Sequence, residues 1–294
     1  MVVPAELIIG IGVNDPAVND VEDFTLANYL HSLRRIALHG YQAIEHTPAH
    51  QLTLDDFRRI AEETQKLGMD SWSVHSDHLN APDEPAIKEY YQRQTLCARI
   101  ASILGCKIMV FHPPAAPLLQ RKMAEVVRQV AAICEDHGVR AGIENCTMLA
   151  AELVGLAQEA DHPNLGFAFD SGHAQLVQSP SSDRVGDMIR GMGSRIWTTH
   201  LQDNWMKRDD HLPPGLGSIN WRNVLESLWE TGYDGPLMVE VTCSLHKASR
   251  DAKELQHLPL EVEQALGIGY LKFLHGAIRG KAPLSISKSN GGQG

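Results

Sequence analysis

The sequence has few basic residues and no long apolar segment. Its 26 lysines and arginines are outnumbered by 36 aspartates and glutamates, so the formal net charge is −10. A general nucleic-acid-binding protein would carry a basic face, and we therefore expect no nucleic-acid partner. No apolar stretch reaches the ~20 residues needed to span a bilayer. We expect no membrane partner either.

The sequence also lacks paired cysteines. Its five cysteines are Cys97, Cys106, Cys134, Cys146 and Cys243. An odd number without CxxC spacing predicts thiols in a reducing compartment, not a disulfide framework or a cysteine-rich zinc site. Residues 1–12 lack the basic region of a signal peptide. These features together predict a cytoplasmic protein.

Eight short apolar segments alternate with eight helical segments along the chain. The predicted strands lie at 7–12, 41–46, 71–75, 107–114, 140–145, 165–170, 196–203 and 235–241. The predicted helices lie at 24–39, 53–68, 85–104, 118–137, 149–160, 183–192, 221–231 and 260–278. Strict alternation of this kind implies a parallel sheet.

Eight units of roughly 30 residues are typical of an α/β protein with a single (β/α)8 TIM barrel. We assign residues 1–281 to the barrel and residues 282–294 to a flexible C-terminal tail. A doubly wound open sheet is the main rival, and it usually carries a glycine-rich phosphate turn after its first strand. Residues 10–15 lack the third glycine of that turn and open no immediate helix.

Residues of metal-ligand type end the predicted strands. The last four strands end in Glu144, Asp170, His200 and Glu240. The second, third and fourth strands end in Glu45 and His46, in His75 and in His112. Just after the sixth and seventh strands follow His173, and then Asp209 and His211. In a barrel these ends share one face. Several buried carboxylates need a cation or matched partners to offset their charge. We therefore predict one divalent metal ion (Mn, Co, Zn or Mg) bound by Glu144, Asp170, His200 and Glu240.

Each of these residues also has an ordinary structural explanation when taken alone. A single histidine at a strand end is more often a hydrogen-bonded structural residue, and Glu45 alone reads as a carboxylate at the barrel mouth. The joint occurrence on four consecutive strands favours a metal site.

Five segments carry a resemblance to a known superfamily. They are 142–145 (Gly-Ile-Glu-Asn), 169–173 (Phe-Asp-Ser-Gly-His), 200–204 (His-Leu-Gln-Asp-Asn), 209–221 and 239–240. In them the sequence resembles the xylose isomerase-like barrels, which include sugar isomerases, ketose 3-epimerases, inosose dehydratase-type proteins and endonuclease IV. The resemblance implies a barrel and a divalent metal. It also implies that Glu144 and Glu240 both bind the metal and move protons.

The leading hypothesis is a metal-dependent sugar or polyol isomerase or epimerase, with Glu144 and Glu240 as catalytic residues. A metal-bound carbonyl acidifies the neighbouring C–H, and one carboxylate removes that proton through an enediolate while the other returns it. The expected substrate-binding residues are His75, His112, His173, Asp209 and His211. Trp72, Trp205 and Trp221 are candidate walls for a sugar ring. The resemblance also implies a homodimer or homotetramer.

Two alternatives stay open. A dehydratase or lyase acting on a keto-sugar or keto-inositol would begin with the same proton abstraction. A trinuclear zinc phosphodiesterase similar to endonuclease IV would use nine ligands, and this chain offers a candidate for each: His75, His112, Glu144, Asp170, His173, His200, Asp209, His211 and Glu240. The acidic charge and the Pro-Pro after His112 disfavour the second alternative.

Overall fold

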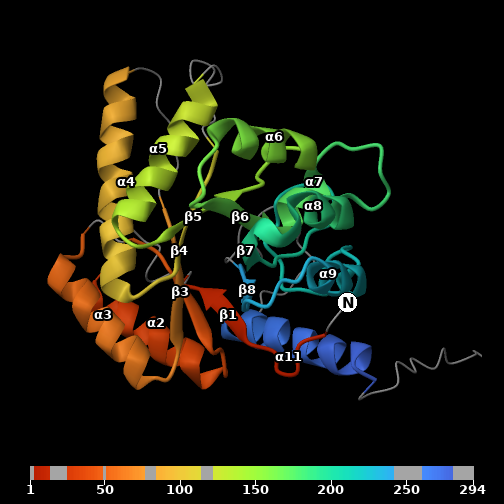
Figure 1. Ribbon diagram of the computed structural model, residues 1–294. Coiled ribbons are helices and arrows are strands. Elements are labelled where there is room, and N and C mark those ends of the chain that lie inside the picture. The colour runs from red at the N-terminus through yellow and green to blue at the C-terminus, as the bar shows by residue number, and fades with distance from the viewer. Residues whose placement is uncertain are drawn as a thin grey trace, which may run out of the picture.

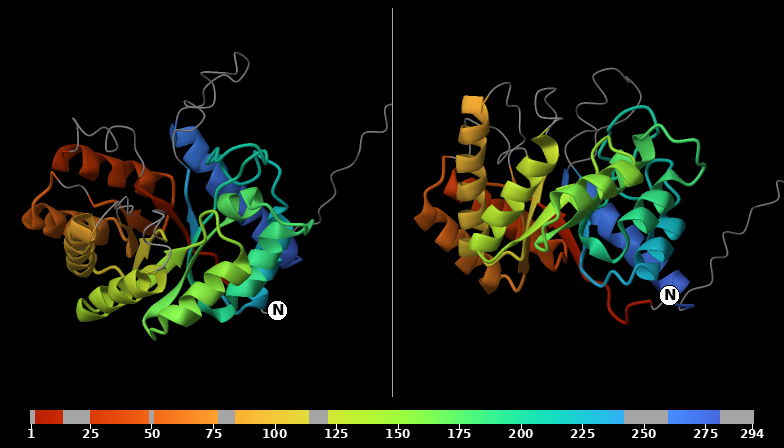
Figure 2. Two further views of the ribbon diagram at one scale, coloured as in Figure 1. Left: turned by 90° about the horizontal axis from the view of Figure 1, so that it is seen from above. Right: turned by 45° about the horizontal axis from the view of Figure 1, so that its top comes forward.

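The computed structural model describes residues 3–13, 25–48, 51–76, 84–113, 122–241 and 260–280. In them one parallel sheet runs in the order β7-β6-β5-β4-β3-β2-β1-β8. Helices connect the strands and flank the sheet on its outer side (Figures 1 and 2). The expected single (β/α)8 barrel is confirmed.

The strands are β1 (Ile9–Gly12), β2 (Ala43–His46), β3 (Asp70–His75), β4 (Ile108–Phe111), β5 (Arg140–Glu144), β6 (Leu165–Asp170), β7 (Ile196–His200) and β8 (Leu237–Val239). The helices are α2 (Leu26–Leu38), α3 (Leu54–Lys66), α4 (Glu84–Leu104), α5 (Met123–Asp136), α6 (Ala150–Ala160), α7 (Ser171–Leu176), α8 (Arg184–Met192), α9 (Trp221–Glu230) and α11 (Leu260–Ile278), with the 3-10 helix η2 (Gly193–Arg195). Every expected strand and helix is present, with ends shifted by a few residues.

The sheet closes between its first and last strands in sequence. β1 pairs with both β2 and β8. Between β7 and β8, Leu201 N–H donates to Met238 O at 2.8 Å and Glu240 N–H donates to Leu201 O at 3.2 Å. On the outside, His275 Nε2 of α11 lies 2.9 Å from Pro4 O. Helix α11 is the blue helix near the N label in Figure 1. These bonds bring the end of β8 next to the end of β7.

The alternation of side chains along each strand decides which residues face the barrel interior. On β4, Met109 and Phe111 face outward into the main core, whereas Ile108 and Val110 form a separate inner cluster with Ala168 of β6. Trp72 and Trp197 pack against this inner cluster. Because successive side chains alternate between faces, the residues that follow at the strand ends also point inward, above this apolar floor.

A β-bulge lies between β2 and β3. Ile44 is the partner of Ser71, but the next residue, Glu45, is the partner of Ser73, so Trp72 is an extra residue on β3. Bulges of this kind re-aim side chains near active sites. Here the bulge sets Glu45 beside Ser73.

One local structure differs from the sequence expectation. No helix was predicted directly after the sixth strand, but the short helix α7 begins there at Ser171. The reason is the cap: the Asp170 side chain accepts a hydrogen bond from His173 N–H at 2.6 Å, which satisfies a free amide at the helix start.

Some expectations fall on residues outside the described ranges. These are the predicted tail at 282–294, Cys243 and the beginning of the helix predicted at 118–137. Within the described residues, Cys97, Cys106, Cys134 and Cys146 are free thiols, as expected. No helix in the described ranges is both long enough and apolar enough to cross a membrane.

Candidate active site

Glu144, at the end of β5, lies at the centre of the polar cluster inside the barrel mouth. Its Oε1 is 2.7 Å from His173 Nδ1. Its Oε2 is 3.0 Å from His200 Nδ1, 3.2 Å from His112 Nε2 and 3.5 Å from His75 Nε2. Glu144 is 1% exposed. One buried carboxylate thus contacts four imidazoles, which come from the end of β3, from just after β4, from α7 and from the end of β7.

His200, at the end of β7, is surrounded by carboxylates on both ring edges. Its Nδ1 lies 3.2 Å from Glu240 Oε2 in addition to its contact with Glu144. Its Nε2 lies 3.0 Å from Glu45 Oε1. Two of the carboxylates therefore face the same ring nitrogen, and the third faces the other one.

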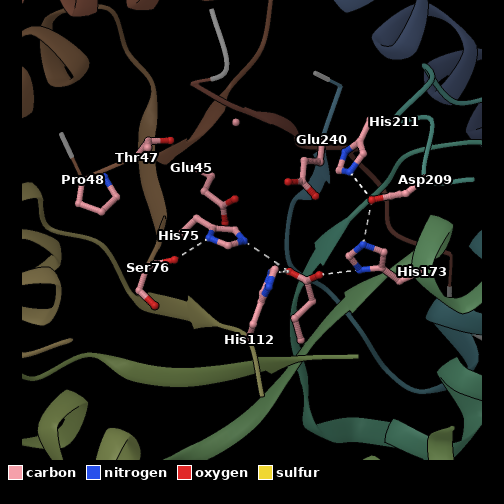
Figure 3. Close-up of a pocket in the computed structure, with 12 residues that line it drawn as sticks. Glu45, Thr47, Pro48, His75, Ser76, His112, His173, Asp209, His211 and Glu240 are labelled. Carbon is pink, nitrogen blue, oxygen red and sulfur yellow. Dashed lines mark hydrogen bonds and ion pairs between the residues drawn. The ribbon is translucent and has the colours of Figure 1, made fainter. Parts of the chain in front are cut away.

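Asp209 links two further histidines above this centre. Its Oδ2 is 3.2 Å from His173 Nε2 and 2.9 Å from His211 Nε2 (Figure 3). Its Oδ1 accepts a hydrogen bond from Gln202 Nε2 at 2.6 Å, and the same amide approaches Asp170 Oδ1 at 3.4 Å. Gln202 connects the two acids.

Asp170, at the end of β6, is fully buried and has one open oxygen. Its backbone N–H donates to Asn145 Oδ1 at 2.7 Å, and Asn145 Nδ2 donates to the Asp170 carbonyl at 3.0 Å. Its Oδ1 caps α7, whereas its Oδ2 has no hydrogen-bond partner among the described residues. A buried oxygen of this kind suits a cation ligand.

The loop after β7 is held in shape by Asp203. Its backbone exchanges hydrogen bonds with Leu212 at 2.7 and 2.9 Å. Its carboxylate accepts from Gly215 N–H at 3.0 Å, Ile219 N–H at 3.1 Å and Trp221 Nε1–H at 2.7 Å. Residues 209–217 read Asp-x-His-x-x-Pro-Gly-x-Gly, and the bonds to Asp203 explain this pattern. The end of the segment anchors the loop that presents Asp209 and His211.

A cavity of about 420 Å³ opens over these groups. It is lined by Gly12, Glu45, Thr47, Pro48, His75, Ser76, His112, Glu144, His173, Asp209, His211 and Glu240 (Figure 3). An adjoining cavity of about 560 Å³ shares His173 and Asp209 with it.

The tryptophans expected to form a sugar-binding wall line neither cavity. Trp221 is buried under the loop after β7. Trp72 donates from Nε1 to Thr198 Oγ1 at 3.2 Å, in the barrel floor. Trp205 is 56% exposed. Trp72 and Trp221 therefore pack inside the protein, and Trp205 lies at its surface.

The carboxylates of the cluster have strongly shifted pKa values. Burial raises the pKa of Glu144, but the nearby charges of His112 and His200 outweigh it and hold the pKa well below its ordinary value. The pKa of Asp209 is lowered against its burial, chiefly by hydrogen bonds with His173 and His211. Burial, with Glu144 nearby, raises the pKa of Asp170 to about 7 against the pull of His173.

The pKa values of the histidines are raised, opposite to those of Glu144 and Asp209. Burial lowers the pKa of each, but neighbouring carboxylates outweigh it and raise the pKa of His75 to about 9, of His211 to about 9 and of His173 to about 12. The pKa of His200 is also raised, by Glu45, Glu240 and Glu144 against its burial. The acids thus draw positive charge into the cluster, and protons or metal ions can supply it.

The donor atoms fit divalent metal ions. Glu144, Asp170 and His200 place ligand atoms within 4.8 Å of one another, and so do His75, His200 and Glu240. These two overlapping sets contain all four residues expected to bind the metal. Three further sets form at the same distance. They are His75, His112 and Glu144; His173, Asp209 and His211; and Glu144, Cys146 and His173. The nine predicted residues therefore do converge, and their donor atoms form more than one set of metal-ligand type.

Sequence reasoning gave too little weight to three residues. Glu45 contacts His200, Gln202 joins Asp170 to Asp209, and Cys146 Sγ lies 3.8 Å from Glu144 Oε1. The strand-end pattern did place Glu45 at the barrel mouth, but it gave this residue no role in the site. Gln202 and Cys146 follow the ligand positions by two residues, and only the folded chain brings them back to the cluster.

The chain matches the family model described as a xylose isomerase-like TIM barrel over residues 33–277. An uncharacterised protein of Methanocaldococcus jannaschii is 31% identical over 177 residues, which are 54% of this chain and 58% of that protein. The D-psicose 3-epimerase of Ruminiclostridium cellulolyticum is 30% identical over 126 residues, 40% of each chain. The inosose isomerase of Halalkalibacterium halodurans is 24% identical over 135 residues, 42% of this chain and 46% of that protein.

The chain thus spans at most 58% of the length of these relatives. Among solved structures, an L-ribulose 3-epimerase superposes with a TM-score of 0.75 at 16% identity and covers 97% of this chain and 99% of its own. The D-psicose 3-epimerase of Clostridium cellulolyticum gives a TM-score of 0.71 at 20% identity, with 92% and 99% covered. At such identities, the likeness to these structures shows a shared fold.

Proposed function

The chain belongs to the xylose isomerase-like TIM barrel family, and on this premise we propose that it is a metal-dependent sugar or polyol isomerase or epimerase. One observation carries the proposal: Glu144 and Glu240 approach the same nitrogen of His200, at 3.0 and 3.2 Å, and both line a cavity of about 420 Å³. The sugar epimerase and inosose isomerase among the relatives support the substrate class.

The proposed metal ligands are Glu144, Asp170, His200 and Glu240. A divalent ion bound there would polarise a substrate carbonyl and acidify the neighbouring C–H. The residues of the chain do the rest. Glu240 is the more accessible carboxylate, with a side chain 14% exposed against 1% for Glu144. In the proposed reaction one of these carboxylates removes the proton next to the carbonyl, and the other returns a proton.

The remaining lining residues bind the substrate in this proposal. His173, Asp209 and His211 form a connected row of donors and acceptors at one side of the cavity. His75 and Ser76 lie at the β3 end, where His75 Nδ1 is 3.0 Å from the Ser76 carbonyl. Groups that both donate and accept suit the hydroxyls of a sugar or polyol.

The test follows proton exchange, which the proposed enediolate mechanism requires whether it ends in isomerisation, epimerisation or dehydration. Ketoses, keto-inositols and sugar phosphates are incubated with the enzyme and Mn²⁺ in D2O, and deuterium next to the carbonyl is measured by NMR. We expect exchange with the wild type and a loss of about 100-fold or more in Glu144→Gln and in Glu240→Gln. Glu226→Gln, on the exposed side of α9, is the control with unchanged exchange. Full activity in the double variant would contradict the assignment, and loss of water from a keto-inositol would point to a dehydratase.

A second candidate function is a trinuclear zinc phosphodiesterase. The specific observation in its favour is that the nine ligand-type residues form distinct sets, with His75, His112 and Glu144 in one and His173, Asp209 and His211 in another. Elemental analysis separates the two candidates. About one metal per chain, lost in Glu240→Ala, supports the isomerase. About three zinc ions per chain, with hydrolysis of a phosphodiester, supports the hydrolase.

A further inference from the structure

His200 presents its two ring nitrogens to different groups. Nδ1 faces Glu144 and Glu240, the proposed metal ligands, at 3.0 and 3.2 Å. Nε2 faces Glu45, at 3.0 Å from Oε1 and 3.1 Å from Oε2. An ionised carboxylate only accepts hydrogen bonds. The partner of Glu45 must therefore be an Nε2–H.

Nδ1 faces two carboxylates in the same way, and a metal ion at Glu144 and Glu240 would take the place of a proton on Nδ1. In that metal-bound state Nδ1 is the ring nitrogen that offers a lone pair. A neutral imidazole carries its proton on one nitrogen only, and the hydrogen bond at that nitrogen decides which one it is. With the proton held on Nε2 by Glu45, the lone pair of Nδ1 points to the space between Glu144 and Glu240. Glu45 thus selects the tautomer that a metal site at these acids needs.

Glu45 is itself held in place by a second contact. Its Oε2 accepts a hydrogen bond from Ser73 Oγ at 2.7 Å. Glu45 is 4% exposed, His200 1% and Ser73 0%. The chain Ser73–Glu45–His200 joins β3 to β2 and then crosses the barrel to β7. No part of it is free to reorient in solvent.

The backbone is shaped to make this contact. The β-bulge at Trp72 shifts the pairing of β2 with β3 so that Glu45 lies opposite Ser73. Without the extra residue, the regular register would set Glu45 opposite Trp72. Bulges next to active sites commonly re-aim one side chain, and here the re-aimed pair is the one that reaches His200.

We propose that Glu45, braced by Ser73, is a positioning residue that orients His200 for metal binding. This inference rests on the metal site of the proposed function and extends it to residues outside the ligand set. Glu45 lies outside the ligand set in this proposal: its oxygens face His200 and Ser73, and it belongs to none of the converging groups of ligand atoms among the described residues.

The neighbouring residue on β2 supplies a matched control. His46 points to the outer side of the sheet, where it contacts Tyr29 Oη at 3.0 Å and Ser71 Oγ at 3.0 Å. It is as buried as Glu45 and belongs to a polar network of similar size. Changing it disturbs a buried hydrogen-bond network on the same strand without touching His200.

The experiment measures metal affinity rather than turnover. Metal-free wild type, Glu45→Gln, Ser73→Ala and His46→Gln are titrated with Co²⁺ against a chromophoric chelator, and the thermal midpoint of each metal-free protein is recorded. We expect Glu45→Gln to weaken the site lost in Glu240→Ala by about 10- to 100-fold. Ser73→Ala should weaken it less, and His46→Gln should leave the Kd unchanged while lowering the thermal midpoint.

The outcomes separate this inference from the proposed function. Wild-type affinity in both Glu45→Gln and Ser73→Ala would overturn the role of Glu45 and leave the metal site standing. Equal weakening in His46→Gln would also overturn it, because a general loss of packing would then explain the effect. If the wild type binds no Co²⁺ at all, the metal site of the proposed function fails. Should Glu45→Gln not fold, Ser73→Ala, which keeps every charge, decides the question alone.

Discussion

Charged side chains of the cluster lie between groups of the opposite charge. Glu144 has imidazoles on each oxygen, His200 has carboxylates on each nitrogen, and Asp209 has a histidine on either side of Oδ2. Such alternation of acids and bases stabilises the ionised form of each member. The cluster therefore has several residues whose replacement leaves a buried partner without its counter-charge.

At the scale of single residues, we predict that replacing Asp209 weakens catalysis. Asp209→Ala removes the acceptor shared by His173 and His211, and charged hydrogen bonds of this kind contribute about 1.5–3 kcal/mol. We expect kcat/KM for the exchanging substrate to fall by roughly 10- to 100-fold, with about one metal per chain retained.

Asp187→Ala, on the outer side of α8, is the matched control, since its partner is Arg190 at the surface. It should leave both the kinetics and the metal content unchanged. A fall from three metals to two in Asp209→Ala would instead place Asp209 among the ligands and favour the hydrolase.

Among the elements, β2 shows how one short strand serves two purposes. Its four residues, Ala43–His46, alternate between the interior and the outer face. Glu45 reaches across the barrel to His200, whereas His46 joins Tyr29 of α2 and Ser71 of β3. The inward residue serves the site, and the outward residue helps to hold α2 against the sheet.

For β2 we predict that His46 makes the stability of the folded chain depend on pH. Burial lowers the pKa of His46 from 6.5 to about 3, against a smaller opposing effect of Glu45. Between these two values the unfolded chain binds a proton at this histidine and the folded chain does not. The contribution of His46 to stability is therefore full above pH 6.5 and is lost as the pH falls toward 3, by up to about 1.4 kcal/mol per pH unit.

Urea unfolding of wild type and His46→Gln from pH 7 to pH 4 measures this contribution. The variant should be less stable at pH 7 and should lose stability less steeply on acidification. Parallel curves for the two proteins would show that His46 is not the group responsible.

At the scale of the whole molecule, the barrel mouth collects negative charge from carboxylates on several strands. Carboxylates from β2, β5, β6, β8 and the loop after β7 meet within one mouth. Repulsion among them is relieved by the histidines or by bound cations. The stability of the folded chain should thus depend on metal.

We expect metal to raise the thermal midpoint. At a free ion concentration 100 times the Kd, binding stabilises the fold by about 2.7 kcal/mol, which corresponds to roughly 5 to 10 °C for a domain of this size. Calorimetry of EDTA-treated protein, with and without added Mn²⁺ or Zn²⁺, tests this. Glu240→Gln should reduce the shift, and an undiminished shift would place the ion outside the predicted ligand set.

The sequence by itself determined the alternation of strands and helices and the positions of the nine ligand-type residues. Both are local properties: apolar runs, glycine stops and a polar residue at each strand end are read within one segment. The rule that parallel strands end on one face then brings Glu144, Asp170, His200 and Glu240 together without any coordinates.

Only the tertiary structure decided how these residues face one another. Glu45 and His200 are 155 positions apart, and their contact depends on the closure of the barrel and on the bulge at Trp72. The same holds for the division of the nine residues into sets around Glu144 and Asp209, and for the tryptophans that pack in the floor and under the loop. Strand tilt, register and side-chain rotamers set such distances, and no pattern within a single strand records them.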